Sequence, residues 1–378
     1  MADAYTLYGM DVSYFTGKLE AYLRYKRVPY VRVETTQRLL LGPLRRHTGV
    51  MKVPVVVTPE GRWLQDSTPM IDWFEARFAA GAVLPDDAVQ ATCCRLLEDY
   101  ADEWLWRPAL HYRWSYRRDA RLLGDRIAAE VLSDVPLPHR LRAAFIRRRQ
   151  YRHYVRGDGV TAATRAHVES VYTATLARLE TILTAQPFLL GGRPCLADFG
   201  FFASMFRHFS LDPTPARIMR DHAPAVYAWV ARLWAARHDT VAGAFAPAGT
   251  LPDGWGALLD DLGAAYLPYL HANAVAWRDG RRTFDYEVQG VAYRSLPVVR
   301  YRVWCRERLQ QHVDALPEAA RETVQALLEA HGCWEPLWRD GTIASHLHDD
   351  TAPPECRPPA RRGLLRRALR ATPWNPLA

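Results

Sequence analysis

The sequence predicts an α/β domain at the N-terminus, an all-helical domain after it, and a mostly helical C-terminal extension that contains a β-hairpin. Three observations predict this order. A strand–helix–strand unit occupies residues 5–33. Helical spacing of apolar residues dominates from 89 to about 237, and two alternating segments separated by Gln289-Gly290 are typical of a hairpin.

The composition is that of a soluble globular chain. Of the 378 residues, 49% are hydrophobic and 24% are charged, which is ordinary for folded domains. No run approaches the roughly 20 apolar residues that a membrane-spanning helix needs, and the first residues lack a signal-peptide pattern. We therefore expect a cytoplasmic protein without a membrane span. Small and proline-rich stretches divide it into the ranges 1–80, 89–240, 250–350 and, for a Pro/Arg-rich tail, 351–378.

The ionisable and sulfur-bearing residues do not predict a metal site. The six cysteines are scattered without paired spacing, so neither zinc ligands nor a disulfide framework is indicated. Four acids within residues 98–103 stand one helical turn apart, and we expect them to form salt bridges with arginines of the same domain.

The first helix begins beside a serine. Tyr5 to Tyr8 alternate as a short strand, Gly9 to Val12 form a loop, and apolar residues recur at helical spacing over 15–25. Ser13 therefore precedes the first turn, where backbone amides lack partners and the helix dipole is positive. A thiol bound there would ionise more easily, although an N-cap role alone also explains a serine at this position.

A proline interrupts the next strand-like segment. Residues 52–57 are rich in valine, yet Pro54 cannot donate to a sheet ladder. A cis peptide bond at Val53-Pro54 would explain this and leave the backbone of Val53 free to pair with a peptide ligand, whereas an edge strand is the plainer alternative.

A second helix start follows a hairpin turn at 58–61. Asp66 and Ser67 precede a helix predicted over 68–78. A hydroxyl and free amides at a helix N-terminus suit a carboxylate, and Asp66 suits an ammonium group. Helix capping alone would also account for both residues.

The order and spacing of these three elements resemble the thioredoxin-like N-terminal domain of the cytosolic glutathione transferase superfamily. The resemblance implies that Ser13 stabilises the glutathione thiolate as the catalytic residue. It also implies that Val53, beside cis-Pro54, binds the cysteinyl backbone of glutathione, and that Asp66 and Ser67 hold its γ-glutamyl end.

One position departs from the family pattern. Many members have proline directly after the catalytic residue, whereas this chain has Tyr14. The hydroxyl of Tyr14 or of Tyr8 is therefore an alternative to Ser13. Because position 13 is not cysteine, disulfide exchange and reductive deglutathionylation, which need an attacking protein thiolate, are disfavoured.

The helical domain also resembles that of the family. Residues 187–199 run from a turn into an apolar helix, where Cys195 replaces the usual capping Ser or Thr and Asp198 is interpreted as structural. A segment rich in arginine and aromatic residues, 107–160, is longer than in ordinary members. The family builds its electrophile pocket where the two domains face each other, so the lining candidates are Tyr14, Trp104, Trp106, His111, Tyr112 and Trp114.

The leading hypothesis is thus an enzyme in which a glutathione thiolate attacks an electrophilic, apolar or aromatic small molecule, as in detoxification. Conjugation, dehalogenation, isomerisation and ether cleavage all begin in this way and are not distinguished. The alternative is a non-catalytic binding or assembly module of the same fold. Interspersed acids disfavour nucleic-acid binding, and family members usually form homodimers. The extension at 250–378 brings no established role with it.

Overall fold

The computed structural model describes residues 4–348 and 353–356. Most of the predicted Pro/Arg-rich tail, 351–378, lies outside these residues. The N-terminal domain contains β1 (Tyr5–Gly9), α1 (Tyr14–Lys26), β2 (Tyr30–Glu34), α2 (Gln37–Leu39), α3 (Arg45–Thr48), β3 (Val55–Val57), β4 (Trp63–Gln65) and α4 (Ser67–Glu75). The strand–helix–strand unit and the helix after Asp66 are therefore confirmed.

The four strands form one mixed sheet in the order β2-β1-β3-β4. β1 runs parallel to β2, and β3 is antiparallel to both β1 and β4. The register aligns Tyr8 with Val55 and Val55 with Gln65. The end of β1, the start of β3 and the end of β4 consequently meet at one edge of the sheet.

The helical domain follows the linker and contains α5 (Ala88–Glu103), α6 (Trp106–Ser115), α7 (Arg117–Glu130), α8 (His139–Gln150), α9 (Arg165–Ala185), α10 (Leu196–Ser204), α11 (Pro213–His222) and α12 (Pro224–Ala235). Short turns of π- or 3-10 helix follow α2, α8 and α10. Helix α10 is completely buried, and Asp198 accepts hydrogen bonds from the N–H groups of Cys195 and Leu189 and from the indole of Trp229. The structural interpretation of Asp198 agrees with these contacts.

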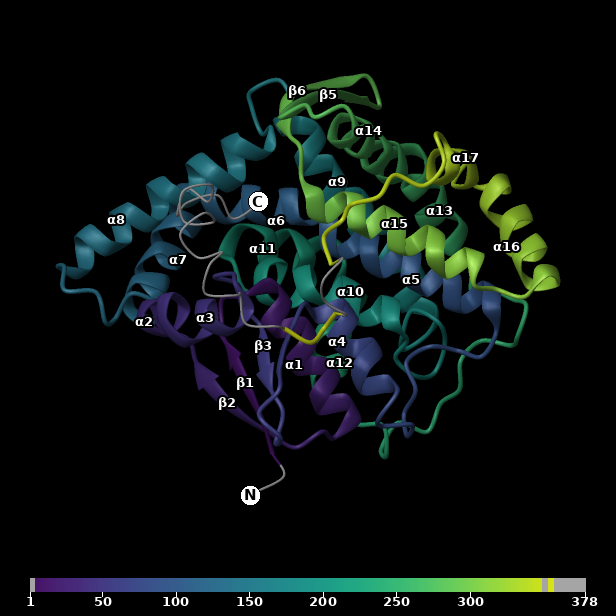
Figure 1. Cartoon of the computed structure of the whole chain (residues 1–378), viewed down its shortest axis with the longest axis horizontal. Helices are drawn as coiled ribbons and strands as arrows, with labels where there is room; N and C mark the ends of the chain where they lie inside the picture. Colours follow the sequence, from purple (N-terminus) through teal and green to yellow (C-terminus); the bar gives the residue numbers. More distant parts are fainter. Residues whose placement is uncertain (1–3, 349–352, 357–378) are drawn as a thin grey trace.

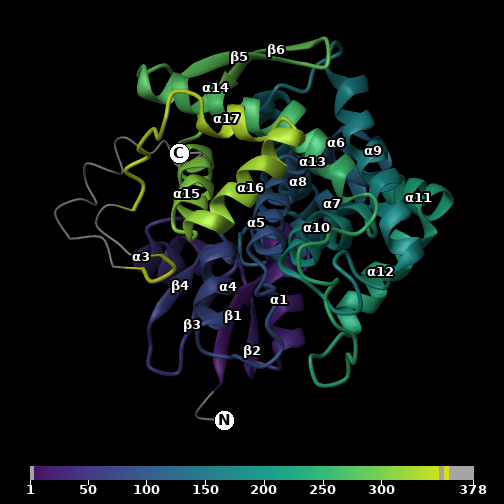
Figure 2. The same cartoon turned by 90° about the vertical axis from the view of Figure 1, so that its right-hand side faces the viewer.

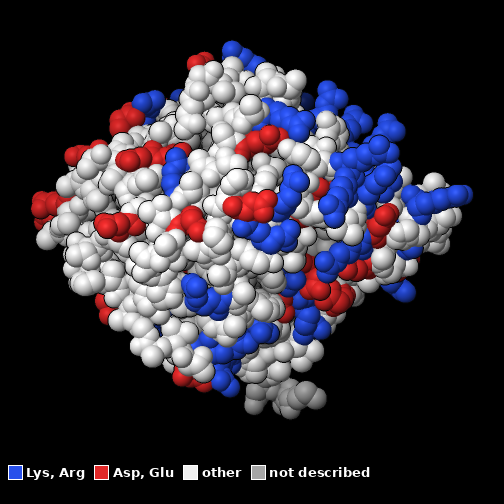
Figure 3. All heavy atoms as spheres, turned by 180° about the vertical axis from the view of Figure 1, so that it is seen from behind, with Lys and Arg blue, Asp and Glu red and all other residues white. Residues whose placement is uncertain are grey.

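The arginine-rich segment forms α6 and a hairpin of α7 and α8 that projects to one side of the molecule (Figure 1). Residues 135–157 contain seven arginines and no acidic residue. Figure 3 shows basic side chains gathered along this side. Leu141 and Phe145 lie on the outer face of α8 and are about half exposed.

The extension contains α13 (Trp255–Asp261), α14 (Leu267–Arg278), β5 (Thr283–Val288), β6 (Val291–Pro297), α15 (Arg300–Asp314), α16 (Glu318–Ala330) and α17 (Trp334–Trp338). The predicted hairpin is confirmed, since β5 and β6 pair antiparallel through Gln289-Gly290, both with positive φ as tight hairpin turns require. Figure 2 shows α15 and α16 lying over α5, above the sheet.

The extension shares the hydrophobic core of the two preceding domains. One cluster of buried apolar residues runs from Tyr5 to Leu337. Across this junction the Tyr100 hydroxyl donates to Asp261 at 2.6 Å, and Arg302 pairs with Glu103 at 2.9 Å. Within 4–348 and 353–356, no helix is long and apolar enough to span a membrane.

Candidate functional site

Ser13 caps α1 at the edge of the sheet where the end of β1, the start of β3 and the end of β4 meet. Its backbone is extended, and its Oγ accepts a hydrogen bond from the N–H of Thr16 at 3.3 Å. Among the described residues, the N–H groups of Tyr14 and Phe15 have no acceptor. Ser13 is partly exposed. The Oγ proton and the free amides can therefore all point to an anion at this helix start.

Tyr14 is placed differently from Ser13. Its ring is buried, and its hydroxyl donates to the carbonyl of Ala101 in α5 at 2.5 Å. Burial, reinforced by the carboxylate of Asp102, raises the pKa of Tyr14 well above its ordinary value. Tyr8 is partly exposed and stacks on Trp63 with ring centroids 5.9 Å apart. Ser13, Tyr14 and Tyr8 are the three hydroxyl candidates from the sequence. The hydroxyl of Tyr14 already forms a hydrogen bond between the two domains.

The loop before β3 contains the predicted cis bond. Val53-Pro54 is cis, and Pro54 is buried while Val53 is partly exposed. Within the described residues, the backbone N–H and C=O of Val53 make no hydrogen bond. An unpaired peptide unit next to the central strand can pair with the backbone of an extended peptide.

Asp66 and Ser67 begin α4 at the same edge. Asp66 has φ 75° and ψ 112°, an uncommon conformation for a residue with a side chain, and it caps α4 through its backbone only. Ser67 is 4% exposed, and its hydroxyl has no hydrogen-bond partner among the described residues. The Asp66 side chain is thus turned away from helix capping and is left for another partner.

Part of Asp66 is exposed, yet its carboxylate is closely surrounded. Desolvation raises the pKa of Asp66 to about 6, although the hydroxyl of Tyr301 and the charge of Arg308 act in the opposite direction. The Tyr301 hydroxyl donates to Oδ1 of Asp66 at 3.1 Å. This contact comes from α15 in the extension, and sequence analysis missed it because 235 positions separate the two residues.

A second part of the extension reaches the same domain. The N–H of Gln65 donates to the carbonyl of Pro354 at 3.0 Å, and the N–H of Cys356 donates to Trp63 at 2.8 Å. Glu355 forms an antiparallel bridge with Leu64. Residues 353–356 therefore cover the outer edge of β4, next to Asp66.

Two buried cations fix the loops around the site, and sequence analysis missed the role of both. Arg113 donates to the carbonyl of Val12 at 2.8 Å and pairs with Asp212 at 2.7 Å, so it holds the residue before Ser13. Lys18 of α1 lies between Glu98 and Asp102 of α5. The only local sign of either role in the sequence was a charged residue on a helix face that is otherwise apolar.

The expectation that the acids of 98–103 pair with arginines of the helical domain is wrong. Glu98 and Asp102 bind Lys18 of the first domain. Asp99 accepts from the Tyr266 hydroxyl at 2.5 Å, and Glu103 pairs with Arg302. The partners come from other domains because the Lys18 side chain reaches α5 from α1 and because the extension packs on α5 through α15 and α16.

The six pocket candidates separate into two groups. Trp106 meets the start of α1, stacking on Phe15 at 5.9 Å and meeting Tyr14 edge-on at 5.7 Å between ring centroids. The other four candidates lie away from the start of α1. Trp104 packs on Tyr266 and Tyr269 of the extension, and Tyr112 packs on Tyr172. His111 is hydrogen-bonded to Glu169 and Ser115, and Trp114 is buried. Burial lowers the pKa of His111, opposed by Glu169.

No group of three or more potential metal ligands occurs in the described parts of the chain. All six cysteines are unpaired, and five of them are buried. Burial raises the pKa of Cys305 well above its ordinary value and that of Cys333 to about 12, so neither thiol is activated as a nucleophile.

Two protein-family models match the chain. The N-terminal domain of glutathione S-transferase matches residues 7–82, and the C-terminal domain matches residues 104–236. Together they take in more than half of the 378 residues. The chain belongs to the glutathione S-transferase superfamily. The expected thioredoxin-like domain and all-helical domain are thereby confirmed, and comparison with curated proteins gives no significant match.

Comparison with solved structures gives matches at low identity. One from Methylobacterium radiotolerans, in complex with glutathione sulfonate, is 20% identical with a TM-score of 0.38 and covers 66% of this chain and 98% of its own. The β-etherase LigF from Sphingobium is 19% identical with a TM-score of 0.44 and covers 61% and 95%. The tau-class enzyme from mango is 16% identical with a TM-score of 0.41 and covers 61% and 89%. The family assignment rests on the two domain models.

Proposed function

We propose that the protein is a glutathione transferase that activates the glutathione thiolate for attack on an electrophilic small molecule. One observation carries the proposal. In a chain of this superfamily, Ser13, the unpaired backbone of Val53 and the Asp66-Ser67 helix start converge on one edge of the sheet.

The proposed chemistry follows from the helix start. The thiol proton leaves to solvent, and the Ser13 hydroxyl donates a hydrogen bond to the resulting thiolate while free amides at the start of α1 add positive potential. The sulfur lone pair then forms a bond to an electrophilic carbon, and the leaving group departs with its electron pair or the π bond shifts. Trp106 and Phe15 offer an aromatic wall beside Ser13, which fits an apolar or aromatic electrophile.

A non-catalytic binding or assembly module is the second candidate. Tyr301 and residues 353–356 border the site and favour it, because extra segments at a binding site can reduce access. Partial exposure of Ser13 favours the enzyme.

The remaining proposals concern the setting of the enzyme. We propose a cytoplasmic homodimer that takes part in detoxification, as its family membership supports. Because α15 and α16 cover one face of α5, a dimer must use another surface. The molar mass from gel filtration with light scattering tests this, and a mass of one chain would exclude the dimer.

Calorimetry with glutathione tests the enzyme directly. We expect the wild-type protein to bind glutathione and Ser67→Ala to bind it about tenfold more weakly, because a hydrogen bond to a carboxylate is lost. We expect thiolate absorbance to appear at a lower pH than for free glutathione, and Ser13→Ala to lose this shift.

Two further variants serve as controls. Tyr14→Phe removes the hydroxyl that donates to Ala101 and should keep the thiolate shift, whereas Ser133→Ala lies at an exposed helix end and should change neither reading. Loss of the shift in Tyr14→Phe but not in Ser13→Ala would assign activation to the tyrosine. Absence of wild-type binding would leave the assembly module.

A further inference from the structure

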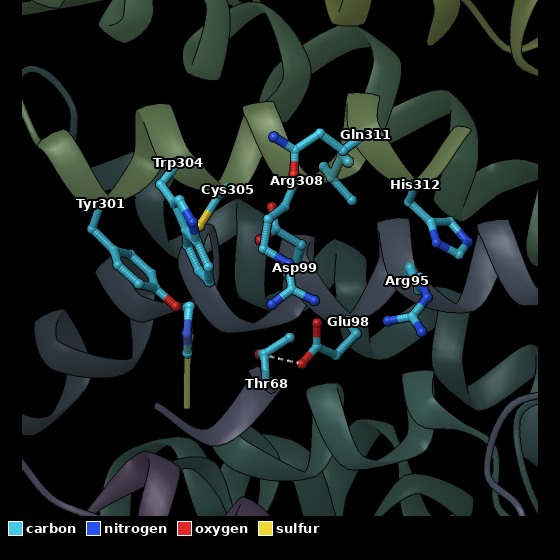
Figure 4. Close-up of a pocket in the computed structure, with 12 residues that line it drawn as sticks. Thr68, Arg95, Glu98, Asp99, Tyr301, Trp304, Cys305, Arg308, Gln311 and His312 are labelled. Carbon is cyan, nitrogen blue, oxygen red and sulfur yellow. Dashed lines mark hydrogen bonds between the residues drawn. The ribbon is translucent and has the colours of Figure 1, made fainter. Parts of the chain in front are cut away.

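A cavity of about 400 Å³ lies where the extension packs against the first two domains. Residues of α4, α5 and α15 line it, together with Pro353. Figure 4 shows the side chains of α15 on one side, facing Thr68 and the acids of α5. The cavity therefore exists only because the extension is present.

The cavity adjoins the start of α4. Thr68 lines it directly and follows Asp66 and Ser67 in the chain. Tyr301 lines it from α15 and donates its hydroxyl to Oδ1 of Asp66 at 3.1 Å. One end of the cavity thus borders, through Thr68 and Tyr301, the proposed binding position of the γ-glutamyl group.

The charges at this end suit an amino-acid zwitterion. Arg308 points from α15 toward Thr68 (Figure 4) and uses one nitrogen to bind Asp72 at 2.6 Å, which leaves further guanidinium donors. The amides of Ser67 and Thr68 have no acceptor among the described residues, and the hydroxyl of the buried Ser67 has no partner there. Donors for a carboxylate and the carboxylate of Asp66 therefore lie next to each other.

The other acids at the cavity are already bound within the protein. Glu98 accepts from Lys18 and from Thr68, and Asp99 accepts from the Tyr266 hydroxyl. Asp72 is shared by Arg95 and Arg308. Asp66, whose partner is a neutral hydroxyl, is the acid at this end that still suits an ammonium group.

Building on the proposed glutathione chemistry, we propose that α15 completes the γ-glutamyl subsite. Arg308 binds the α-carboxylate of glutathione together with the amides at the start of α4. Tyr301 is a positioning residue that orients Asp66 toward the ammonium group. The extension thereby selects thiols that carry a γ-glutamyl group over thiols that lack one.

The test compares glutathione with cysteinylglycine, which lacks the γ-glutamyl group. Calorimetry on the full chain gives the selectivity ratio, which is the dissociation constant of cysteinylglycine divided by that of glutathione. We expect Arg308→Gln to reduce the wild-type ratio at least about tenfold by weakening glutathione alone, and Arg308→Lys, which keeps the charge, to restore part of it. We expect Tyr301→Phe to reduce the ratio about threefold to tenfold.

Arg95→Gln is the matched control. Arg95 also lines the cavity and also binds Asp72, at 3.0 Å, but it belongs to α5 and stands on the side of His312 in Figure 4. Its ratio should equal that of the wild type. Circular dichroism and the melting temperature establish that each variant is folded.

The outcomes separate this inference from the proposed function. If Ser67→Ala weakens glutathione binding but both the Arg308 and the Tyr301 variants keep the wild-type ratio, the subsite proposal is overturned and the enzyme proposal stands. If Arg95→Gln lowers the ratio as much as Arg308→Gln, the effect comes from Asp72 and the proposal also fails. If the wild type binds neither thiol, both proposals fall together.

Discussion

At the scale of single residues, the proposed role of Asp66 in holding the ammonium group of glutathione makes binding depend on pH. Desolvation raises its pKa to about 6 against the opposing effects of Tyr301, Arg308, Lys18 and Lys52. Only the ionised carboxylate attracts an ammonium group. A carboxyl with this pKa is mostly ionised at pH 7.5 and mostly protonated at pH 5.

We therefore predict that glutathione affinity falls as the pH is lowered through 6. For one titrating group, the dissociation constant should rise about tenfold for each pH unit below the pKa. Calorimetry between pH 5 and 7.5 measures this, since the ammonium group of glutathione stays charged over that range. Asp66→Asn should bind weakly with a flat profile, and Tyr301→Phe should move the rise to higher pH because a bond to the carboxylate is lost. A flat wild-type profile would contradict the role of Asp66.

Site residues could be predicted where a few neighbouring positions in the sequence indicate their role. Ser13, Pro54 and Asp66 were predicted because a helix cap, a proline in a strand and a second cap are readable from a few neighbouring positions. Tyr301 and Arg308 were not predicted because their partners lie more than 230 positions away. Nothing in the local pattern of α15 marks these two positions.

At the scale of elements, Lys18 joins three helices at one buried point. It contacts Glu98 and Asp102 of α5, and its ammonium donates to Thr68 of α4 at 3.1 Å. Burial alone would lower the pKa of Lys18, but the two carboxylates outweigh this and raise it above its ordinary value. Burial also raises the pKa of Asp102 well above its ordinary value, although Lys18 opposes this.

Lys18→Met should destabilise the protein by about 3–5 kcal/mol, because it leaves buried carboxylates without a counter-charge. Urea unfolding at pH 7 measures the free energy. The loss should shrink at lower pH as the carboxylates take up protons. The triple variant with Glu98→Gln and Asp102→Asn removes the uncompensated charges and should recover most of the stability. A loss below about 1 kcal/mol in Lys18→Met would show that the ion cluster is not a structural junction.

Helix contacts explain why the pocket candidates were predicted less well than the helices themselves. Eight of the ten residues of α6 are buried, so the sequence of this helix has no polar face to orient it. Trp106 faces α1, whereas Tyr112 faces the interior of the helical domain. Composition identified an aromatic helix but carried no information on which rings face the first domain.

At the scale of the whole molecule, the extension shares one apolar core with the two preceding domains. The apolar cluster that begins at Tyr5 continues to Leu337 without a break. Buried polar contacts cross the same junction, including Tyr100 with Asp261 and Arg302 with Glu103. The sequence predicted the extension as a separate range, 250–350, because linker composition shows where the chain turns and not what it packs against.

We predict that the full chain unfolds in a single cooperative transition. Differential scanning calorimetry should give equal calorimetric and van't Hoff enthalpies, and fluorescence and far-ultraviolet circular dichroism should give the same midpoint. Arg302→Met removes the guanidinium that Glu103 binds and should lower this one midpoint without splitting the transition. Two separate transitions, with the second unaffected by Arg302→Met, would mean that the extension folds independently. In that case α15 could leave α4 without global unfolding, and the γ-glutamyl subsite would open and close rather than stand preformed.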